Sequence, residues 1–146
     1  MRLSTKSLYG VRAVFDIAYN SRDLPVQVKD ISSRQKISPR YLEQIFQKLK
    51  KAGILQSKRG PKGGYSLAKD ISNITVGDIL RATEGPPDLV FCVAPKRLGK
   101  CNLLDQCVTR PIWEETGRRI AEYLDSVSID DLCRRGKSMG IEQDGW

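Results

Sequence analysis

Three cysteines within one short stretch are the residues of this chain best suited to bind a metal. Cys92, Cys101 and Cys107 are separated by eight and five residues, downstream of the turn-forming residues 85–87. Their thiolates are soft ligands for zinc or for iron–sulfur clusters. A zinc site would need a fourth Cys or His, and the chain contains no histidine. A disulfide would leave an odd thiol. From the spacing alone, an iron–sulfur cluster, a zinc site and a disulfide stay open as three alternatives.

The rest of the chain argues against an enzyme. Without histidine, Ser-His-Asp triads and histidine metal sites cannot form. The glycine-rich stretch 59–64 lacks the GxxxxGK[ST] spacing of a phosphate-binding loop and is not followed by a helix. The fourth cysteine, Cys133, lies in a short apolar stretch, and we predict that it is a buried small side chain rather than a ligand.

Positive charge is concentrated in the first part of the chain. The 146 residues carry a formal net charge of +8, yet residues 1–84 hold 16 Lys and Arg against 7 Asp and Glu, whereas residues 85–146 hold 9 against 10. Such a basic surface attracts a polyanion such as nucleic acid. Nothing in the sequence approaches the ~18 apolar residues of a membrane span, and the N-terminus lacks a signal-peptide pattern. We therefore expect a cytoplasmic protein with reduced thiols that does not bind membranes.

The charged residues accompany a pattern of elements that indicates a mainly α fold with a small β-hairpin. The elements are a helix over 6–20, a short helix over 26–34, a helix opened by Ser38-Pro39 and ended by Gly53, strands over 54–58 and 65–68, a helix capped by Thr75, and a long helix opened by Pro111. A helix-turn-helix followed by a glycine-rich hairpin with a basic tip is typical of a winged helix-turn-helix.

In this fold, the third helix and the hairpin would contact DNA. A helix in the major groove presents side chains to base edges, while a hairpin places cations along phosphates or in the minor groove. The predicted DNA-binding residues are Arg40, Tyr41, Glu43, Gln44, Lys48, Arg59 and Lys62. Glu43 is unusual on this face because phosphates repel a carboxylate. Its presence would be explained if it accepted a hydrogen bond from a cytosine amino group. A surface ion pair of Glu43 with Arg40 or Lys50 is the alternative. Arg59 suits the minor groove of A·T-rich DNA.

The chain divides into four predicted segments. These are a DNA-binding domain over 1–84, a cysteine-containing sensor loop over 85–108, a dimerisation helix with a short following helix over 109–134, and a flexible tail over 135–146. In the long helix, Trp113, Ile120, Leu124 and Val127 lie close to a heptad seam, which favours a homodimer. An amphipathic helix packed on its own domain is the alternative.

Four stretches resemble the IscR/NsrR/CymR class of bacterial winged-helix regulators. They are residues 1–6, the run Tyr41-Leu42-Glu43-Gln44, the hairpin residues 59–65 and residues 74–79. The resemblance covers roughly residues 1–133. It implies a homodimer joined through the long helix that binds palindromic operator DNA as a repressor, with base contacts at Tyr41, Glu43, Gln44 and Arg59.

The resemblance also implies that Cys92, Cys101 and Cys107 hold an iron–sulfur cluster, 2Fe–2S rather than 4Fe–4S, which senses oxidants, nitric oxide or iron supply. The fourth ligand stays open. Arg110 stands where some relatives have a histidine, and Leu8 where others have an acidic ligand. The candidates left are Asp105, Glu114, Glu115, a partner-chain group, an exogenous thiol or water. A cluster-free regulator that responds to a small molecule or partner protein is one alternative function, and an architectural DNA binder is another.

Overall fold

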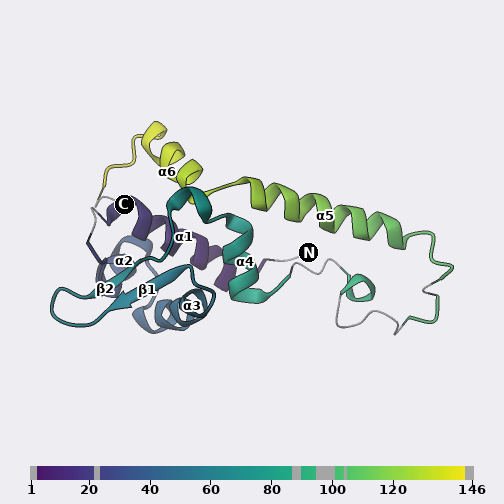
Figure 1. Cartoon of the computed structure of the whole chain (residues 1–146), viewed down its shortest axis with the longest axis horizontal. Helices are drawn as coiled ribbons and strands as arrows, with labels where there is room; N and C mark the ends of the chain where they lie inside the picture. The colour runs from purple at the N-terminus through teal and green to yellow at the C-terminus, as the bar shows by residue number, and fades with distance from the viewer. Residues whose placement is uncertain (1–2, 22–23, 87–89, 95–100, 104, 144–146) are drawn as a thin grey trace.

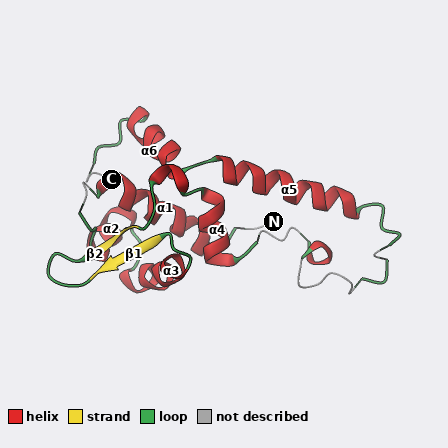
Figure 2. Cartoon of the chain, in the orientation of Figure 1, coloured by secondary structure: helices red, strands yellow, loops and turns green. Residues whose placement is uncertain are grey.

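The computed structural model describes residues 3–21, 24–86, 90–94, 101–103 and 105–143. In chain order its elements are α1 (Thr5–Asn20), α2 (Val28–Gln35), α3 (Pro39–Lys51), β1 (Leu55–Lys58), β2 (Gly64–Leu67), the short 3-10 helix η1 (Ile71–Asn73), α4 (Val76–Glu84), the short 3-10 helix η2 (Phe91–Val93), α5 (Arg110–Ser126) and α6 (Ile129–Ser138). The prediction of a mainly α fold with one hairpin is confirmed (Figure 2). Among the described residues no helix is both long and apolar enough to cross a membrane.

The core forms around α1, which packs against α2, α3, α4 and α6. The apolar face predicted for α3 is buried as expected, with Leu42, Ile45, Phe46 and Leu49 at most 1% exposed. Each such side chain stabilises the fold by about 1.5–3 kcal/mol through removal of apolar surface from water. Because this face is fixed to α1, the opposite face of α3 is held towards solvent.

Local signals set the ends of the helices. The Ser38 side chain accepts a hydrogen bond from the Tyr41 backbone N–H, with Pro39 in the first turn, so α3 begins where the sequence predicted. Gly53, with a φ of 72°, follows the end of α3. Thr75 and Asp78 form a reciprocal capping box that begins α4.

The hairpin is anchored to the body of the domain at its root. Strands β1 and β2 are antiparallel, with Leu55 opposite Leu67. Tyr65 forms a bridge with Val26 through two 2.8 Å backbone hydrogen bonds. Its ring lies 4.6 Å from the ring of Phe46 on α3, measured between centroids. Gly64 is required here, because its φ is 154° and a Cβ would lie 2.4 Å from the Val26 carbonyl oxygen. The hairpin tip thus projects from a fixed base.

The two C-terminal helices take different directions. Helix α5 leads away from the body, whereas α6 folds back onto α1 (Figure 1). Helix α6 continues to Ser138, past the predicted segment boundary at residue 134. The Tyr19 hydroxyl donates to the Ile141 carbonyl oxygen at 2.7 Å. The Gln143 side-chain amide donates to the Tyr19 carbonyl oxygen at 3.0 Å. The contact of α6 with α1 explains why this helix extends beyond residue 134.

Candidate nucleic-acid interface

A buried polar network fixes α2 against α1 and so sets the frame of the helix-turn-helix. The Asp16 side chain is fully buried and accepts hydrogen bonds from Arg34 at 2.7 and 3.0 Å and from Gln35 at 2.8 Å. Arg12 on α1 donates to the backbone and side-chain oxygens of Gln35. A buried carboxylate is tolerated only when it is paired and hydrogen-bonded in this way. The network therefore fixes the angle at which the chain enters α3.

Three of the predicted DNA-binding side chains on α3 point into solvent. Arg40, Glu43 and Gln44 are exposed, and within the described part of the chain none of them has a hydrogen-bond or ion-pair partner. The alternative ion pair of Glu43 with Arg40 or Lys50 is thus not formed among these residues. The Lys50 ammonium instead donates to the Ser57 hydroxyl on β1 at 2.7 Å. The polar groups of this face are available to a ligand.

Tyr41 and Lys48, the other two predicted DNA-binding residues on α3, contact neighbouring helices of the protein. The ring of Tyr41 is half-buried and meets Tyr9 of α1 edge to face at 5.9 Å between centroids. The Lys48 ammonium donates to the Thr83 carbonyl oxygen at 2.7 Å, near the C-terminal end of α4. A cation at that position satisfies a carbonyl that the helix leaves free. Lys48 therefore joins α3 to α4 rather than pointing freely away from the protein.

The hairpin tip carries the other two predicted residues. Arg59 and Lys62 are exposed in the turn between β1 and β2, and the Gln27 side chain donates to the Pro61 carbonyl oxygen at 3.3 Å. At the root of the hairpin, burial and the Glu43 carboxylate together raise the pKa of Tyr65. This electrostatic coupling indicates that Glu43 and the hairpin root share one region of the surface. Helix α3 and the hairpin are neighbours in the fold (Figure 1).

Two further residues belong to this region, although the sequence analysis did not select them. Gln47 is exposed and follows Glu43 and Gln44 by four and three residues, so helical spacing places it on their face. Lys6 of α1 lines a small pocket with Gln44 and Lys48. The spacing could have identified Gln47. Lys6 could not be identified, because its position depends on how α1 packs against α3.

The three loop cysteines are free thiols of intermediate exposure. Cys92 lies in η2, and Cys107 precedes α5 by a few residues. Within the described ranges no three Cys, Asp or Glu side chains are close enough together to hold a metal ion. The structure thus does not gather the predicted ligands Cys92, Cys101 and Cys107 into one site.

The chemistry of the thiols nevertheless distinguishes the loop from Cys133. Hydrogen bonds from the Thr109 hydroxyl and from the backbone N–H groups that follow lower the pKa of Cys107, which favours the thiolate that a metal requires. Burial raises the pKa of Cys133, so this cysteine is the apolar side chain that the sequence predicted. In donor type the loop fits a thiolate-bound iron–sulfur cluster.

Two of the fourth-ligand candidates already have partners. The Glu114 carboxylate pairs with Arg110 at 2.7 Å. Glu115 pairs with Arg118 and Arg119, which lowers its pKa to about 2. A metal would have to compete with these guanidinium groups for the carboxylates, whereas Asp105 is exposed without such a pair in the described residues.

A contact between Arg81 and Asp125, called the joint below, connects the C-terminal end of α5 to α4 of the DNA-binding domain. The Arg81 guanidinium on α4 donates to Asp78 at 2.9 Å and to Asp125 on α5 at 2.7 Å. Gly77 lies beneath this contact, where a Cβ would be 1.9 Å from the Asp125 carboxylate. Because α4 also packs on α1 and α3, the joint is a physical connection between α5 and the exposed face of α3.

Comparisons with known proteins agree with this geometry. The profile of a family described as Rrf2, iron-dependent transcriptional regulator, matches residues 3–135. The HTH-type transcriptional regulator IscR of Klebsiella pneumoniae is 41% identical over 141 residues, which cover 97% of this chain and 85% of that protein. The solved structure of T. potens IscR has a TM-score of 0.77 at 37% identity, covering 98% of this chain and 93% of that one. The solved structure of CymR, the global cysteine regulator of B. subtilis, has a TM-score of 0.77 at 31% identity, covering 92% of this chain and 98% of that one.

Proposed function

Because this chain belongs to the Rrf2 family of iron-dependent transcriptional regulators, we propose that two copies bind a palindromic operator and repress transcription until a sensing loop changes state. The chain is a DNA-binding regulator and not an enzyme, in line with the relatives named above. Its site of action is the cytoplasm. In each protomer, α3 enters the major groove and the hairpin tip contacts the adjacent backbone or minor groove.

The observation that carries this proposal is the set of unpaired polar side chains beside a basic hairpin. Arg40, Glu43 and Gln44 have no partner among the described residues, so no internal bond must break before they contact bases. Glu43 accepts from a cytosine amino group, a contact that also disfavours other bases. Arg59 and Lys62 supply cations to phosphates or to a narrow minor groove.

Tyr41 and Lys48 act from more fixed positions. The edge-to-face contact with Tyr9 orients the Tyr41 ring, and its hydroxyl is the group that reaches the DNA. Lys48 holds α3 against the carbonyl of Thr83 and thereby sets the depth at which the helix enters the groove.

Selection from random DNA duplexes followed by salt titrations of the selected sequence tests the DNA-binding proposal. The expected product is a palindrome whose binding weakens steeply with salt. Glu43→Ala is expected to lose discrimination at one base pair per half-site while keeping most of its affinity. Arg59→Ala is expected to weaken binding to all sequences and to reduce the salt slope. Lys137→Ala, which removes an exposed cation from α6, is the matched control and should change neither property.

The homodimer proposal rests on α5. No side chain of this helix is buried within the chain, and Trp113 and Tyr123 are 40% and 65% exposed. A long helix that exposes large apolar residues is stabilised by pairing with a second copy. We propose that the seam of Trp113, Ile120 and Leu124 contributes to this interface, together with Val127, which lies directly after the end of α5. Sedimentation equilibrium should give twice the monomer mass, and a monomer at operator-binding concentrations would contradict the proposal.

For sensing, we propose that Cys92, Cys101 and Cys107 hold an iron–sulfur cluster, 2Fe–2S rather than 4Fe–4S, with a fourth ligand that is still to be identified. When bound, the cluster supplies redox chemistry and sensitivity to oxidants. The chain's own part is to present thiolates, as the lowered pKa of Cys107 favours, and to hold the loop at the start of α5. The Arg81–Asp125 joint then passes a change in the loop to α4 and the DNA-binding domain.

Anaerobic purification followed by a visible spectrum and iron and sulfide assays tests the sensing proposal. Cys92→Ser, Cys101→Ser or Cys107→Ser should each abolish the absorbance and the iron content. Cys133→Ser, on the buried thiol, is the matched control and should retain both. A colourless, iron-free protein with full and regulated operator affinity would favour the second candidate, a cluster-free regulator that responds to a small molecule or partner protein. The observation in favour of that candidate is that, among the described residues, no three Cys, Asp or Glu side chains lie close enough together to hold a metal ion.

A further inference from the structure

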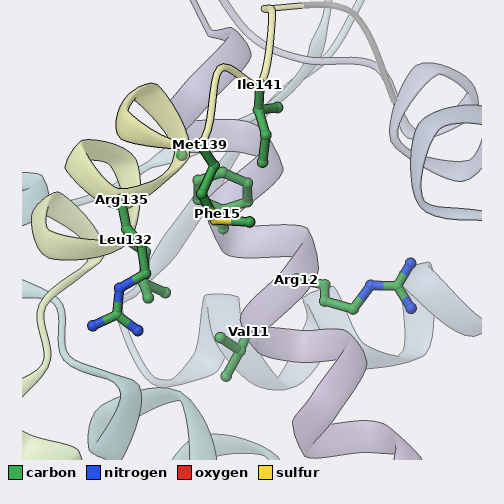
Figure 3. A pocket seen from close by; sticks show the side chains of 8 residues that line it. Val11, Arg12, Phe15, Leu132, Arg135, Met139 and Ile141 are labelled. Atoms are coloured by element: carbon green, nitrogen blue, oxygen red, sulfur yellow. The ribbon is translucent and has the colours of Figure 1, made fainter.

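Two cavities adjoin α1, and their linings suit different ligands. The larger, about 260 Å³, lies between α1 and the C-terminal part of the chain, with apolar side chains such as Phe15 and Met139 in its wall (Figure 3). Its exposed surface is almost entirely carbon, so it offers little to an anion. The smaller, about 80 Å³ and called the lysine niche below, lies where α1, α3 and α4 meet. It is lined by Lys6, Gln44, Ile45, Lys48 and Thr83.

The lysine niche has two cations and no carboxylate in its lining. The Lys6 side chain is exposed and makes no hydrogen bond or ion pair with any other described residue. The Lys48 ammonium gives one N–H to the Thr83 carbonyl oxygen at 2.7 Å, and its other two N–H groups stay available. The Gln44 amide adds a neutral donor. Because ammonium groups bind phosphate as point charges, the lining suits a phosphodiester.

The backbone that carries Lys6 is fixed to α4 on both sides of this residue. The Ser4 N–H donates to the Glu84 carboxylate at 3.1 Å. The hydroxyls of Ser7 and Thr83 share a buried hydrogen bond of 3.1 Å. The first turn of α1 is therefore held against the last turn of α4, and the Lys6 backbone is in place before DNA binds. The Glu84 carboxylate does not line the lysine niche.

Helical geometry places the lysine niche on one flank of the exposed face of α3. Lys48 and Lys50 are separated by about 200° around the helix. Lys48 contacts α4, whereas Lys50 donates to Ser57 on β1 at 2.7 Å. The exposed side chains of Glu43 and Gln44 lie between these two flanks. When a helix lies in the major groove, its flanks face the two phosphate backbones that border the groove. The hairpin is next to one backbone, and the lysine niche is next to the other.

We propose that Lys6 and Lys48 together bind one phosphate of the operator strand on the α1 side of each half-site. This contact rests on the DNA-binding function proposed above and adds α1 to the elements that hold the operator. With the hairpin on one strand and the lysine niche on the other, α3 is prevented from rolling about its axis. Phosphate contacts of this kind position a recognition helix, and they thereby fix which base edges meet Glu43.

Replacement of Lys6 tests the cation without loss of an internal contact, because its side chain has no partner among the described residues. Lys6→Ala should weaken operator binding about 3–10-fold in fluorescence anisotropy and lower the salt slope by about one. Lys6→Arg should restore most of both, since it restores the charge. Lys137→Ala removes an exposed cation from α6 and is the matched control, which should change neither property.

Operators with a single methylphosphonate identify the phosphate, because this group replaces one charged phosphate by a neutral one. At one position per half-site, the substitution should weaken wild-type binding several-fold and have little effect on binding by Lys6→Ala. A direct contact gives such coupling, whereas a purely structural role of Lys6 gives additive effects at every position. Lys48→Gln should couple with the same phosphate.

The outcomes separate this contact from the DNA-binding proposal. Additive effects of Lys6→Ala at every phosphate would overturn the contact and leave operator binding intact. Coupling of Lys6 and Lys48 to different phosphates would overturn the shared site. Inorganic phosphate should compete no better than chloride at equal ionic strength, and stronger competition that disappears in Lys6→Ala would assign the niche to a free anion instead. A wild-type protein that selects no operator would overturn both proposals.

Discussion

Replacement of Asp16 tests whether the buried network joins α1 to α2. Asp16→Ala removes a fully buried carboxylate that accepts three hydrogen bonds of 2.7, 3.0 and 3.2 Å from Arg34 and one of 2.8 Å from Gln35. Removing one member of a buried ion pair costs about 3–5 kcal/mol. Since the Arg34 side chain is 13% exposed, water can solvate part of the guanidinium, and we expect a loss near the lower limit, about 3 kcal/mol.

Urea unfolding monitored by circular dichroism measures this loss. Asp30→Ala is the matched control, because it removes the same charge from an exposed position in the first turn of α2. Its expected cost is about 0.5 kcal/mol, from weaker interaction with the helix dipole. A loss for Asp16→Ala that falls within 1 kcal/mol of the control would show that the network is not what fixes α2 to α1. Operator affinity should fall together with stability, because α2 sets the entry to α3.

Three other perturbations test separate parts of the structure. Gly77→Ala places a Cβ 1.9 Å from the Asp125 carboxylate, so the contact between Arg81 and Asp125 must open. Thermal unfolding should then show that the free energy of unfolding falls by about 1–3 kcal/mol. An unchanged transition would contradict the role of this contact. Tyr9→Ala removes an edge-to-face contact worth about 0.5–1.5 kcal/mol and should weaken operator binding in fluorescence anisotropy roughly 2–10-fold, whereas Tyr9→Phe should bind like wild type. Asp131 accepts hydrogen bonds from the backbone and then the side chain of Ser128, which lower its pKa below the ordinary 3.8. Its contribution to α6 is therefore fully present above pH 3.8 and is lost as the pH falls through the lower folded value. Asp131→Asn should remove this component from an acid titration of helicity, and an identical acid titration in the variant would argue against it.

Local patterns in the sequence were sufficient to predict the helix-turn-helix and the hairpin. The serine and proline at 38 and 39 mark the start of α3, and the spacing of Leu42, Ile45 and Leu49 identifies its buried face. Thr75 marks the start of α4, and the glycines at 60, 63 and 64 mark the turn of the hairpin. These signals act within a few residues, so no knowledge of tertiary packing is needed to interpret them.

Contacts between distant residues could not be predicted in this way. Lys48 donates to the Thr83 carbonyl oxygen, which is 35 residues away and on another helix. The pair of Asp16 and Arg34 spans 18 residues, and α6 continues past residue 134 because it packs on α1. The sequence identified the cysteines by type and spacing, but their positions in the loop depend on tertiary structure and ligation.

Hydrogen exchange of the protein with and without its selected operator tests most directly whether α3 and the hairpin form the DNA-binding surface. The amides of Ser38, Arg40 and Tyr41 at the start of α3, and those of Arg59, Gly60, Lys62 and Gly63 in the hairpin turn, should exchange more slowly when operator is bound. Amides on the solvent face of α6 should be unaffected. Protection confined to α6, or unchanged exchange in both α3 and the hairpin at saturating operator, would contradict the account.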